Sequence, residues 1–408
     1  MLIGATNERK TMKKIMMLGG NYVQMTATLA AKSQGYYVIS VDYLPNNPAH
    51  RFADEYYNVS TIDKEAVLEL AKKLNIDGIV SYASDVSAPT AAYVAESMRL
   101  PTNPYKSVHI LTHKNEFRRF MQDTGFPMPK GSTFKTLNEA LLFFQSLGSP
   151  VMIKPVDSSG SKGVFLCQTE QELINRWDES MQYSLEKSII VEEFIKKKGY
   201  QIDGDIFMID GEIVFWGICD QHHDMELAPY VPIGLSYPST QPQHIQEKAF
   251  LQVKEILSRL KMTMGAYNVE YIVGQNDQVY ILEIGPRNGG NFIPNVIKAA
   301  TGYDMATLTV RQAVGDDCSH LQKWKLEKPV SSYNIHSHKD GVFDGLDISK
   351  ELEGHIIDTL MYEEQGVQVK KFHNSCDSLG ICLITYNNVN ELCEKIDNMN
   401  NYIKVVVK

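Results

Sequence analysis

Apolar and polar residues follow two different rhythms along the chain, and the first of them covers the N-terminal part. Short apolar runs at 14–18, 37–41 and 78–82 are separated by stretches compatible with helices, including 63–74. Strands that alternate with helices at this spacing predict a parallel sheet with right-handed crossover connections. We therefore expect a Rossmann-like α/β domain over residues 12–110.

The second rhythm begins at about residue 132 and continues to 315, where paired strands have helices between them. Hairpin signals at Asp210-Gly211 and at 274–277 indicate antiparallel neighbours, so this region is α+β in character. A helix is predicted at 112–124, with Thr112 as its N-terminal cap. The predicted strands are 151–154, 163–168, 188–194, 204–210, 212–219, 266–274 and 278–284.

The pattern changes again near residues 325–332, and the remainder is rich in His, Asn and short strands. We expect a small C-terminal α+β cap there. The predicted fold class is thus a multidomain chain that is α/β and then α+β, divided at 12–110, 111–320 and 321–408. Residues 1–11 are predicted to be a disordered extension.

Charge and composition narrow the classes of protein. Forty basic against forty-nine acidic residues leave a net charge of -9, which argues against a dedicated nucleic-acid binder. The six cysteines include no C-x-x-C pair, so free thiols in a reducing cytoplasm are favoured over disulfides or zinc. No stretch approaches the roughly 20 apolar residues that span a bilayer, and a signal peptide is not recognisable. We expect a cytoplasmic protein without membrane or nucleic-acid partners.

The N-terminal unit raises the possibility of a dinucleotide site, because Asp42 ends the second apolar run where a ribose-binding acid would stand. The glycine fingerprint G-x-G-x-x-G is broken, however. Gly19-Gly20 is followed by Asn21, and Gln24 stands where a helix must pack closely on a strand. An NAD-dependent oxidoreductase is therefore disfavoured.

Lys154 marks the first segment that can carry chemistry. It lies at the end of an apolar run and is followed by Pro155, which places an ammonium group at the edge of a sheet. A loop rich in Ser and Gly (residues 158–163, the Ser/Gly loop) comes next, and its N–H groups could wrap phosphate oxygens. It is not a P-loop, and an ordinary Gly/Ser turn explains this segment equally well.

Two glutamates, Glu192 and Glu193, end a second apolar strand at 189–195. Such a strand can clamp a purine through its backbone, although two glutamates at a strand end are usually solvated.

The strongest segment is a predicted hairpin that carries one carboxylate in each apolar strand, Glu270 and Glu283. An uncompensated buried carboxylate is costly and tends to become neutral. A divalent cation bridging both would remove that cost, and Mg²⁺ typically takes one or two carboxylates together with nucleotide phosphates. Arg287 can give bidentate contacts to a carboxylate or phosphoryl group, and Gly289-Gly290 allows close backbone approach. The alternative is a structural Glu/Arg pairing in the core.

These segments, in this order, resemble the ATP-grasp superfamily. The resemblance runs through Lys114, Ile153-Lys154-Pro155, the Ser/Gly loop, the strand at 191–195, Glu270 and the Glu283-x-Gly-Pro-Arg287 run. It is closest to the branch that contains phosphoribosylglycinamide synthetase, biotin carboxylase and carbamoyl-phosphate synthase, and it covers residues 14 to 315. It implies a pre-ATP-grasp domain, an ATP-grasp domain with the nucleotide and Mg²⁺ site, and the small C-terminal cap.

The resemblance also implies roles for individual residues. The phosphates would be contacted by Lys114, Lys154 and the loop residues Ser159, Gly160, Ser161 and Gly163. The base and ribose would be contacted by Glu192, by the backbone of Glu193 and Ile195, and by Gln201, which lies where many relatives have a ribose-binding Glu. Mg²⁺, with Mn²⁺ as an alternative, would be held by Glu270 and Glu283. Arg287 and Lys154 would be catalytic and stabilise the transferring phosphoryl group.

One departure from the family pattern bears on the metal. The usual E-x-N-P-R run has Asn as a further ligand, and Gly285 replaces it here. Asn288 or Asn291 could compensate, so one metal ion and two remain alternatives.

The resemblance favours an ATP-dependent carboxylate–amine ligase that forms an acyl phosphate, with small-molecule substrates and a homodimeric assembly. The alternatives are a bicarbonate-activating carboxylase-type subunit and an ATP-binding protein without ligase turnover.

Two histidine-containing segments have no place in this scheme. Residues 220–224 run Asp-Gln-His-His-Asp, and they are interpreted as a solvated or substrate-contacting loop rather than a metal site, because adjacent residues on a strand point to opposite faces. His336 and His338 could share a face, and we interpret them as a surface pair.

Overall fold

The computed structural model describes residues 12–158, 162–319 and 324–408. Three sequence predictions lie outside the described residues: the disordered extension at 1–11, the loop residues Ser159, Gly160 and Ser161, and the domain boundary at 320/321.

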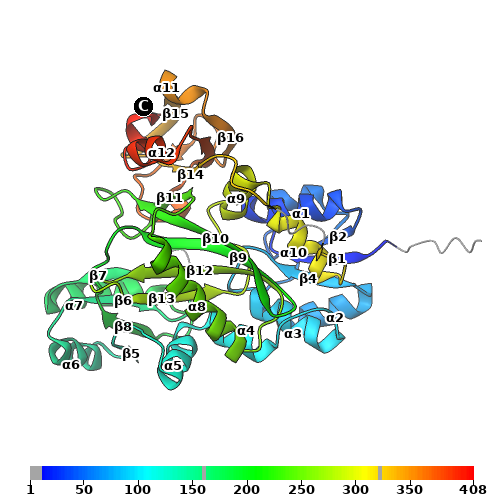
Figure 1. The fold of residues 1–408 in the computed structure, drawn as a ribbon, viewed down its shortest axis with the longest axis horizontal. Helices are drawn as coiled ribbons and strands as arrows, with labels where there is room; N and C mark the ends of the chain where they lie inside the picture. Colours follow the sequence, from blue (N-terminus) through cyan, green and yellow to red (C-terminus); the bar gives the residue numbers. More distant parts are fainter. Residues whose placement is uncertain (1–11, 159–161, 320–323) are drawn as a thin grey trace, which may run out of the picture.

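The N-terminal part is built on a four-stranded parallel sheet with the order β3-β2-β1-β4 (Figure 1). Its apolar strands are buried by helices, as is typical of parallel sheets. The predicted parallel sheet is therefore confirmed, while its assignment as a Rossmann-like domain stays a prediction. The elements are β1 (Lys14–Leu18), α1 (Tyr22–Ser33), β2 (Tyr37–Val41), η1 (Pro48–Phe52), β3 (Glu55–Tyr57), α2 (Lys64–Leu74), β4 (Gly78–Ser81) and α3 (Ala88–Met98).

Asp42 and Gln24 have structural contacts in this unit. The Asp42 carboxylate accepts hydrogen bonds from the Gly20 N–H at 2.9 Å and from the Asn47 amide at 2.7 Å. The buried Gln24 amide donates to the carbonyl of Tyr82 at 2.9 Å. Asp42 thus organises the turn between β1 and α1, and Gln24 fixes α1 to the loop after β4.

The helix predicted at 112–124 is divided in two. Helix α4 (Tyr105–Thr112) ends where α5 (Lys114–Thr124) begins, and His113 is the residue between them. The Thr112 hydroxyl donates to the carbonyls of Val108 and His109, so it closes α4 and does not cap α5. The predicted cap is wrong because a Ser or Thr hydroxyl can equally donate backwards within a preceding helix.

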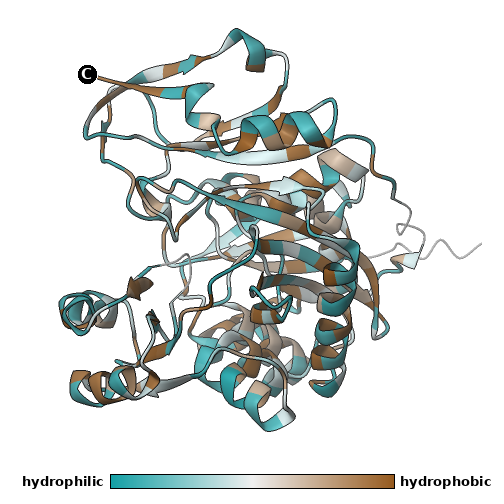
Figure 2. Cartoon of the chain, turned by 60° about the vertical axis from the view of Figure 1, so that its left-hand side comes forward, coloured by the Kyte–Doolittle hydropathy of each residue, from teal (hydrophilic) through white to brown (hydrophobic). Residues whose placement is uncertain are grey.

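A second sheet, order β5-β8-β6-β7, is antiparallel and carries Lys154 and Glu192 on neighbouring strands. Helices α6 and α7 cover it, and the helices in Figure 2 carry hydrophilic and hydrophobic residues side by side. The elements are β5 (Gly131–Phe134), α6 (Leu137–Leu147), β6 (Val151–Pro155), β7 (Phe165–Cys167), α7 (Glu170–Gln182) and β8 (Ile189–Glu193).

The largest sheet has eight strands in the order β13-β12-β9-β10-β11-β14-β18-β16, and all its pairings are antiparallel. Helix α8 packs against one part of it and α9 against another, while α10 lies between this sheet and α1 (Figure 1). The first strands and helices are β9 (Gln201–Ile209), β10 (Glu212–His223), β11 (Pro232–Tyr237), α8 (Gln243–Arg259), β12 (Gly265–Val273), β13 (Val279–Gly285), α9 (Ile293–Thr301) and α10 (Met305–Ala313).

The C-terminal residues extend this sheet and add a three-stranded sheet, order β17-β15-β19, at the top of Figure 1. Strands β14, β18 and β16 join the large sheet beside β11, so the sheet continues across the predicted change of domain. The elements are β14 (Val330–Ile335), β15 (Gly341–Ile348), α11 (Lys350–Glu353), β16 (Ile356–Met361), β17 (Gln368–Val369), η3 (Ser375–Asp377), β18 (Gly380–Thr385), α12 (Val389–Ile396), η4 (Met399–Asn401) and β19 (Ile403–Val407).

The interpretation of residues 220–224 as a solvated or substrate-contacting loop is wrong in that the segment is neither a loop nor solvated, while substrate contact stays a prediction. Strand β10 runs to His223, and the side chains of Asp220, His222 and Asp224 are almost wholly buried. The reason is that distant segments pair with these polar groups: Asp220 accepts from Ser239 and Thr240, and His222 contacts Asp397 and Ser236.

Candidate active site

Strands β12 and β13 form an antiparallel hairpin, as the sequence predicts, and their register places Glu270 directly opposite Glu283. The connection closes through the Gly274 N–H, which donates to the carbonyl of Gln278 at 2.9 Å. Burial raises the pKa of Glu270 well above its usual range, and the negative charges of Asp203 and Glu283 raise it further. The Gln201 amide donates to Glu270 at 3.3 Å, so Gln201 lies beside this predicted metal-binding carboxylate.

Two further carboxylates on the neighbouring strand β9 complete an acidic cluster (Asp203, Asp205, Glu270 and Glu283). Burial raises the pKa of Asp203 to about 6 and that of Asp205 to about 7. The Asn268 amide donates to Asp203 at 2.6 Å and to Asp205 at 3.2 Å. Sequence reasoning missed Asp203 and Asp205, although both interrupt an otherwise apolar strand in the same way as Glu270.

Arg287 is held at the edge of this cluster by a residue from the N-terminal part. Its guanidinium forms a bidentate ion pair with Asp85, which follows β4, and its Nε lies 2.8 Å from Asp85 Oδ1. Nη1 donates to the Asn268 side-chain oxygen at 2.9 Å. Burial opposes the charge of Arg287, but Asp85 outweighs it and raises the arginine pKa further. Asp85 carried no signal in the sequence.

The same ion pair explains why Gly285 replaces the usual Asn. A Cβ atom at position 285 would lie 2.7 Å from Asp85 Oδ1 and 3.1 Å from Arg287 Cζ. A side chain there would therefore displace the pair. Of the two asparagines that could compensate, Asn288 accepts from Thr309 at 2.9 Å and Asn291 accepts from Asn334 at 3.3 Å.

Lys154 and Glu192 form a buried ion pair across β6 and β8, and Arg118 of α5 joins them. Arg118 Nε lies 3.2 Å from Glu192 Oε2, and its Nη1 donates to the carbonyl of Leu282 at 2.9 Å. Burial alone would raise the pKa of Glu192, but the two cations lower it to about 2. This ion-pair group (Lys154, Glu192 and Arg118) links the small sheet to β13. Sequence reasoning missed Arg118, because a lone Arg on a polar helix is unremarkable.

Lys114 lies between the acidic cluster and the Ser/Gly loop. Its Nζ is 3.3 Å from Glu283 Oε2 and donates to the carbonyl of Ser158 at 2.8 Å. Gly163 closes the loop with φ of +73°, where a Cβ atom would meet Pro155 at 2.9 Å. Glu193 ends β8 and Ile195 follows it, and the Glu193 N–H donates to the carbonyl of Lys130 at 2.7 Å.

The arrangement suits a magnesium nucleotide chemically. The cluster supplies hard carboxylate oxygens, which Mg²⁺ prefers, and burial, with a smaller contribution from the neighbouring carboxylates, raises the pKa values of Asp203, Asp205 and Glu270. Lys114, Lys154 and Arg287 each pair with a carboxylate around the cluster and can neutralise phosphate charge. The residues present therefore fit the predicted ligand.

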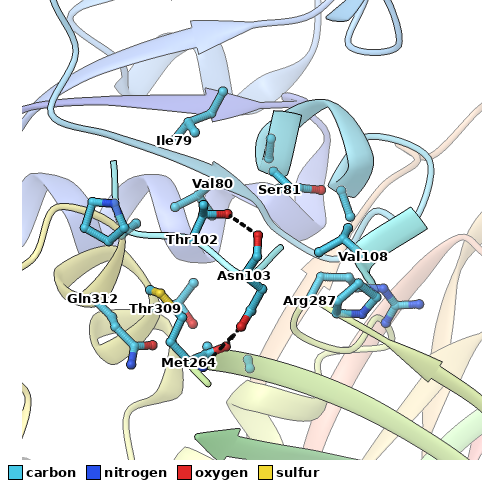
Figure 3. A pocket seen from close by; sticks show the side chains of 18 of the residues that line it. Ile79, Val80, Ser81, Thr102, Asn103, Val108, Met264, Arg287, Thr309 and Gln312 are labelled. Carbon is cyan, nitrogen blue, oxygen red and sulfur yellow. Dashed lines mark hydrogen bonds between the residues drawn. The ribbon is translucent and has the colours of Figure 1, made fainter. Parts of the chain in front are cut away.

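A separate small cavity of about 100 Å³ lies where β4, the 101–103 segment, β12 and α10 meet (Figure 3). Thr102, Asn103 and Met264 are hydrogen-bonded along its wall, and Arg287 borders it. Its lining does not include Lys114, Lys154, Glu270 or Glu283, so it is distinct from the predicted nucleotide contacts.

Within the described residues, every helix is too short or too polar to cross a lipid bilayer.

The small sheet with its Ser/Gly loop, the large antiparallel sheet and the charged residues between them define a protein of the ATP-grasp class. The family model of the carbamoyl-phosphate synthase L chain, ATP-binding domain, matches residues 113–321, just over half of the chain. The chain therefore belongs to this ATP-grasp family, and the predicted superfamily is confirmed.

Curated relatives resemble the chain at low identity. An uncharacterized protein, y4rH, of Sinorhizobium fredii is 24% identical over 339 residues, covering 80% of this chain and 68% of that protein. The C-terminal section of the Aquifex aeolicus carbamoyl phosphate synthase large chain is 26% identical over 322 residues. That match covers 74% of this chain and 58% of the section, and matches to undivided large chains cover about 30% of them.

Solved structures share the fold over nearly the whole chain. The L-amino acid ligase of Bacillus licheniformis superposes with a TM-score of 0.81 at 19% identity, covering 97% of this chain and 99% of that one. Phosphoribosylglycinamide synthetase of Anaerococcus prevotii superposes with a TM-score of 0.76 at 23% identity, and the match covers 97% of this chain and 100% of that one. A third structure is the biotin carboxylase domain of the Hydrogenobacter thermophilus 2-oxoglutarate carboxylase, a dimer with MgADP and bicarbonate. It superposes with a TM-score of 0.75 at 16% identity, and the match covers 97% of this chain and 91% of that one.

Proposed function

We propose that the protein is an ATP-dependent carboxylate–amine ligase that works through an acyl phosphate. The observation that carries this proposal is the facing pair Glu270 and Glu283, with Lys114 at 3.3 Å from Glu283 and Arg287 held beside them. The fold shared with an L-amino acid ligase and a phosphoribosylglycinamide synthetase over 97% of the chain supports it.

The nucleotide end of the site follows from the charges. Glu270 and Glu283 would hold Mg²⁺, which when bound supplies charge neutralisation at the phosphates. Lys114 and Lys154, which pair with Glu283 and Glu192, exchange these carboxylate partners for phosphate oxygens. Glu192 and the backbone beyond it receive the adenine ring, and closure of the loop excludes water from the reacting phosphate.

The chemistry requires little covalent work from the protein. An oxygen of the substrate carboxylate attacks the γ-phosphorus of ATP, and the bond to the β-phosphate oxygen breaks with release of ADP. The amine nitrogen then attacks the acyl carbon, phosphate departs with the electrons of the carbon–oxygen bond, and the amine loses a proton. Arg287 stabilises the charge on the transferring group, because its guanidinium is already oriented by Asp85 and Asn268.

A bicarbonate-activating role is the second candidate. It is favoured by the common fold with a biotin carboxylase domain whose structure contains MgADP and bicarbonate. In this case bicarbonate takes the place of the organic carboxylate, and the chain acts as one subunit of a larger enzyme. The dimeric state of that domain also supports the predicted homodimer.

The test is to incubate the purified protein with Mg-ATP, hydroxylamine and either a pool of amino acids and other carboxylic acids or bicarbonate. Hydroxylamine intercepts acyl phosphates as hydroxamates. We expect ADP and hydroxamate to form together when organic acids are present, and neither to form with Glu283→Gln. Glu255→Gln, an exposed change on α8, is the matched control and should react normally.

ADP release with bicarbonate alone, and none with any organic acid, would replace the ligase by the carboxylase-type function. Full turnover by a folded Glu283→Gln protein would contradict both.

A further inference from the structure

Three potential metal ligands that are far apart in the sequence meet beside the large sheet: Asp224, His336 and His338. Asp224 directly follows β10, and the two histidines directly follow β14; β11 separates these two strands in the sheet (Figure 1). Their ligand atoms all lie within 4.8 Å of one another. The interpretation of His336 and His338 as a surface pair is wrong for His336, whose side chain is completely buried.

Asp224 is oriented so that one oxygen is anchored and the other faces the histidines. Its Oδ1 accepts from the N–H groups of Glu226 and Leu227, both at 2.9 Å. Its Oδ2 lies 3.5 Å from His336 Nε2 and 3.3 Å from His338 Nε2. These hydrogen bonds and the nearby imidazoles outweigh burial and lower the pKa of Asp224, so the carboxylate is charged.

His336 presents a bare nitrogen to that oxygen. Its Nδ1 lies 2.7 Å from the carbonyl oxygen of Asn334, and since a carbonyl can only accept, Nδ1 carries the proton. In the neutral ring Nε2 then carries no proton and presents a lone pair. This atom is buried without a hydrogen-bond partner among the described residues. A buried lone pair that faces a carboxylate oxygen is unfavourable unless a cation lies between them.

A proton and a metal ion are the two cations that could lie between these atoms. His338 is also close, with its side chain 43% exposed, so the cluster opens to solvent on that side. The Asn400 side-chain N–H group donates to Asp224 Oδ2 at 3.2 Å and lies 3.3 Å from His338 Nε2.

We propose that Asp224 Oδ2, His336 Nε2 and His338 Nε2 bind a divalent transition-metal ion, and we assign it as Zn²⁺. Imidazole and carboxylate ligands suit Zn²⁺, whereas Mg²⁺ prefers oxygen ligands. The distances from Asp224 Oδ2 to the two histidines, 3.5 and 3.3 Å, also fit, because ligands about 2.0–2.1 Å from a tetrahedral zinc ion lie roughly 3.3–3.4 Å apart. Water from the open side supplies the fourth position.

The groups around the ligands match those found behind metal sites. A ligating histidine usually donates its second N–H to a carbonyl or carboxylate, and a ligating carboxylate is itself hydrogen-bonded. His336 donates to Asn334, and Asp224 accepts from two backbone N–H groups. The ion would connect the segment after β14 to the end of β10. Asp224 lies three residues beyond Gln221, and the Gln221 amide donates to Asp203 of the acidic cluster.

The experiment measures zinc binding by the full-length protein after chelator treatment, with excess Mg²⁺ present to occupy the acidic cluster. The variants are His338→Ala, which alters a half-exposed ring, and Asp224→Asn; His373→Ala, on an exposed histidine of the same C-terminal part, is the matched control. Bound metal is determined by mass spectrometry, and affinity by competition with a chromogenic chelator. Circular dichroism of the metal-free proteins confirms folding.

We expect one equivalent of zinc in the wild type and in His373→Ala, and affinity at least about 100-fold weaker in His338→Ala and Asp224→Asn. Cobalt in place of zinc should give visible absorption bands in the first two proteins only. Zinc bound equally by wild type and His338→Ala would place it elsewhere, for example on the exposed thiols of Cys376 and Cys393, and would overturn the proposal. Absence of binding to the wild type would leave an imidazolium–carboxylate pair and would overturn it as well.

Discussion

The two charged regions of the candidate active site treat their carboxylates in opposite ways. In the ion-pair group, Glu192 is neutralised by Lys154 and Arg118, and its pKa falls to about 2. In the acidic cluster, Asp203 and Asp205 have pKa values raised to about 6 and about 7. In the first region two cations face one carboxylate, whereas in the second four carboxylates face Lys114 and an arginine that is already paired with Asp85. This difference is what a site for a divalent cation requires.

Removing a carboxylate from the acidic cluster should have the largest effect. We expect Glu270→Gln and Glu283→Gln each to reduce the rate of ADP formation by at least about 100-fold, because a metal ligand is lost. Their free energy of unfolding without metal should not fall, since a charge is removed from a region with excess negative charge. Steady-state kinetics and urea denaturation check the two parts, and a loss of stability without metal would contradict the comparison.

Removing the carboxylate of the ion-pair group should, in contrast, lower the free energy of unfolding. Because the pKa of folded Glu192 is lowered from 4.5 to about 2, its charge stabilises the fold above pH 4.5, and this contribution is lost as the pH falls towards 2. Glu192→Gln should therefore lower the free energy of unfolding by about 3 kcal/mol at pH 7.

The difference from wild type should shrink below pH 4.5. Urea denaturation at pH 7, 5 and 3.5 measures it. A deficit that is the same at all three values would show that Glu192 acts through packing and not through charge.

Asp85 and Gly285 test whether the ion pair to Arg287 belongs to the site. Asp85→Asn should lower kcat about tenfold with little change in KM, because the guanidinium loses its orientation. Gly285→Asn should destabilise the fold by about 1–3 kcal/mol, since its side chain collides with Asp85.

In the double variant Asp85→Ala with Gly285→Asn, we expect the stability cost of Gly285→Asn to be smaller than in the wild-type background. Strict additivity of the two free-energy changes would show that the two positions do not share space.

The smallest effect is expected at Gln201, whose amide contacts Glu270. Gln201→Glu adds a further carboxylate to the region with excess negative charge. In the absence of Mg²⁺ it should lower the melting temperature by about one or two degrees relative to the wild type. Addition of Mg²⁺ should remove this difference. Differential scanning calorimetry with and without Mg²⁺ measures this, and an unchanged apo protein would place residue 201 outside the cluster.

Much of the fold could be predicted because it depends on local patterns. The parallel strands of the N-terminal sheet are continuous apolar runs, and the short connection between Glu270 and Glu283 fixes their pairing within one hairpin. The strand at 189–195 and Lys154 were found for the same reason.

What could not be predicted depends on partners that are distant in the chain. Asp85 lies 202 residues from Arg287, and no local pattern connects them. His222 is buried because Asp397 reaches it from the C-terminal part, and His336 because the sheet continues through β14. Asp203 and Asp205 differ, since a carboxylate in an apolar strand was a signal already used for Glu270.

The most direct test of the central claim is a calorimetric titration of the protein with ADP, in the presence and absence of Mg²⁺, for wild type and Glu283→Gln. We expect one nucleotide bound per chain, with affinity that rises on addition of Mg²⁺ in the wild type and does not rise in Glu283→Gln. Glu255→Gln should behave as wild type. Nucleotide binding that is equally strong with and without Mg²⁺ in all three proteins would contradict the account.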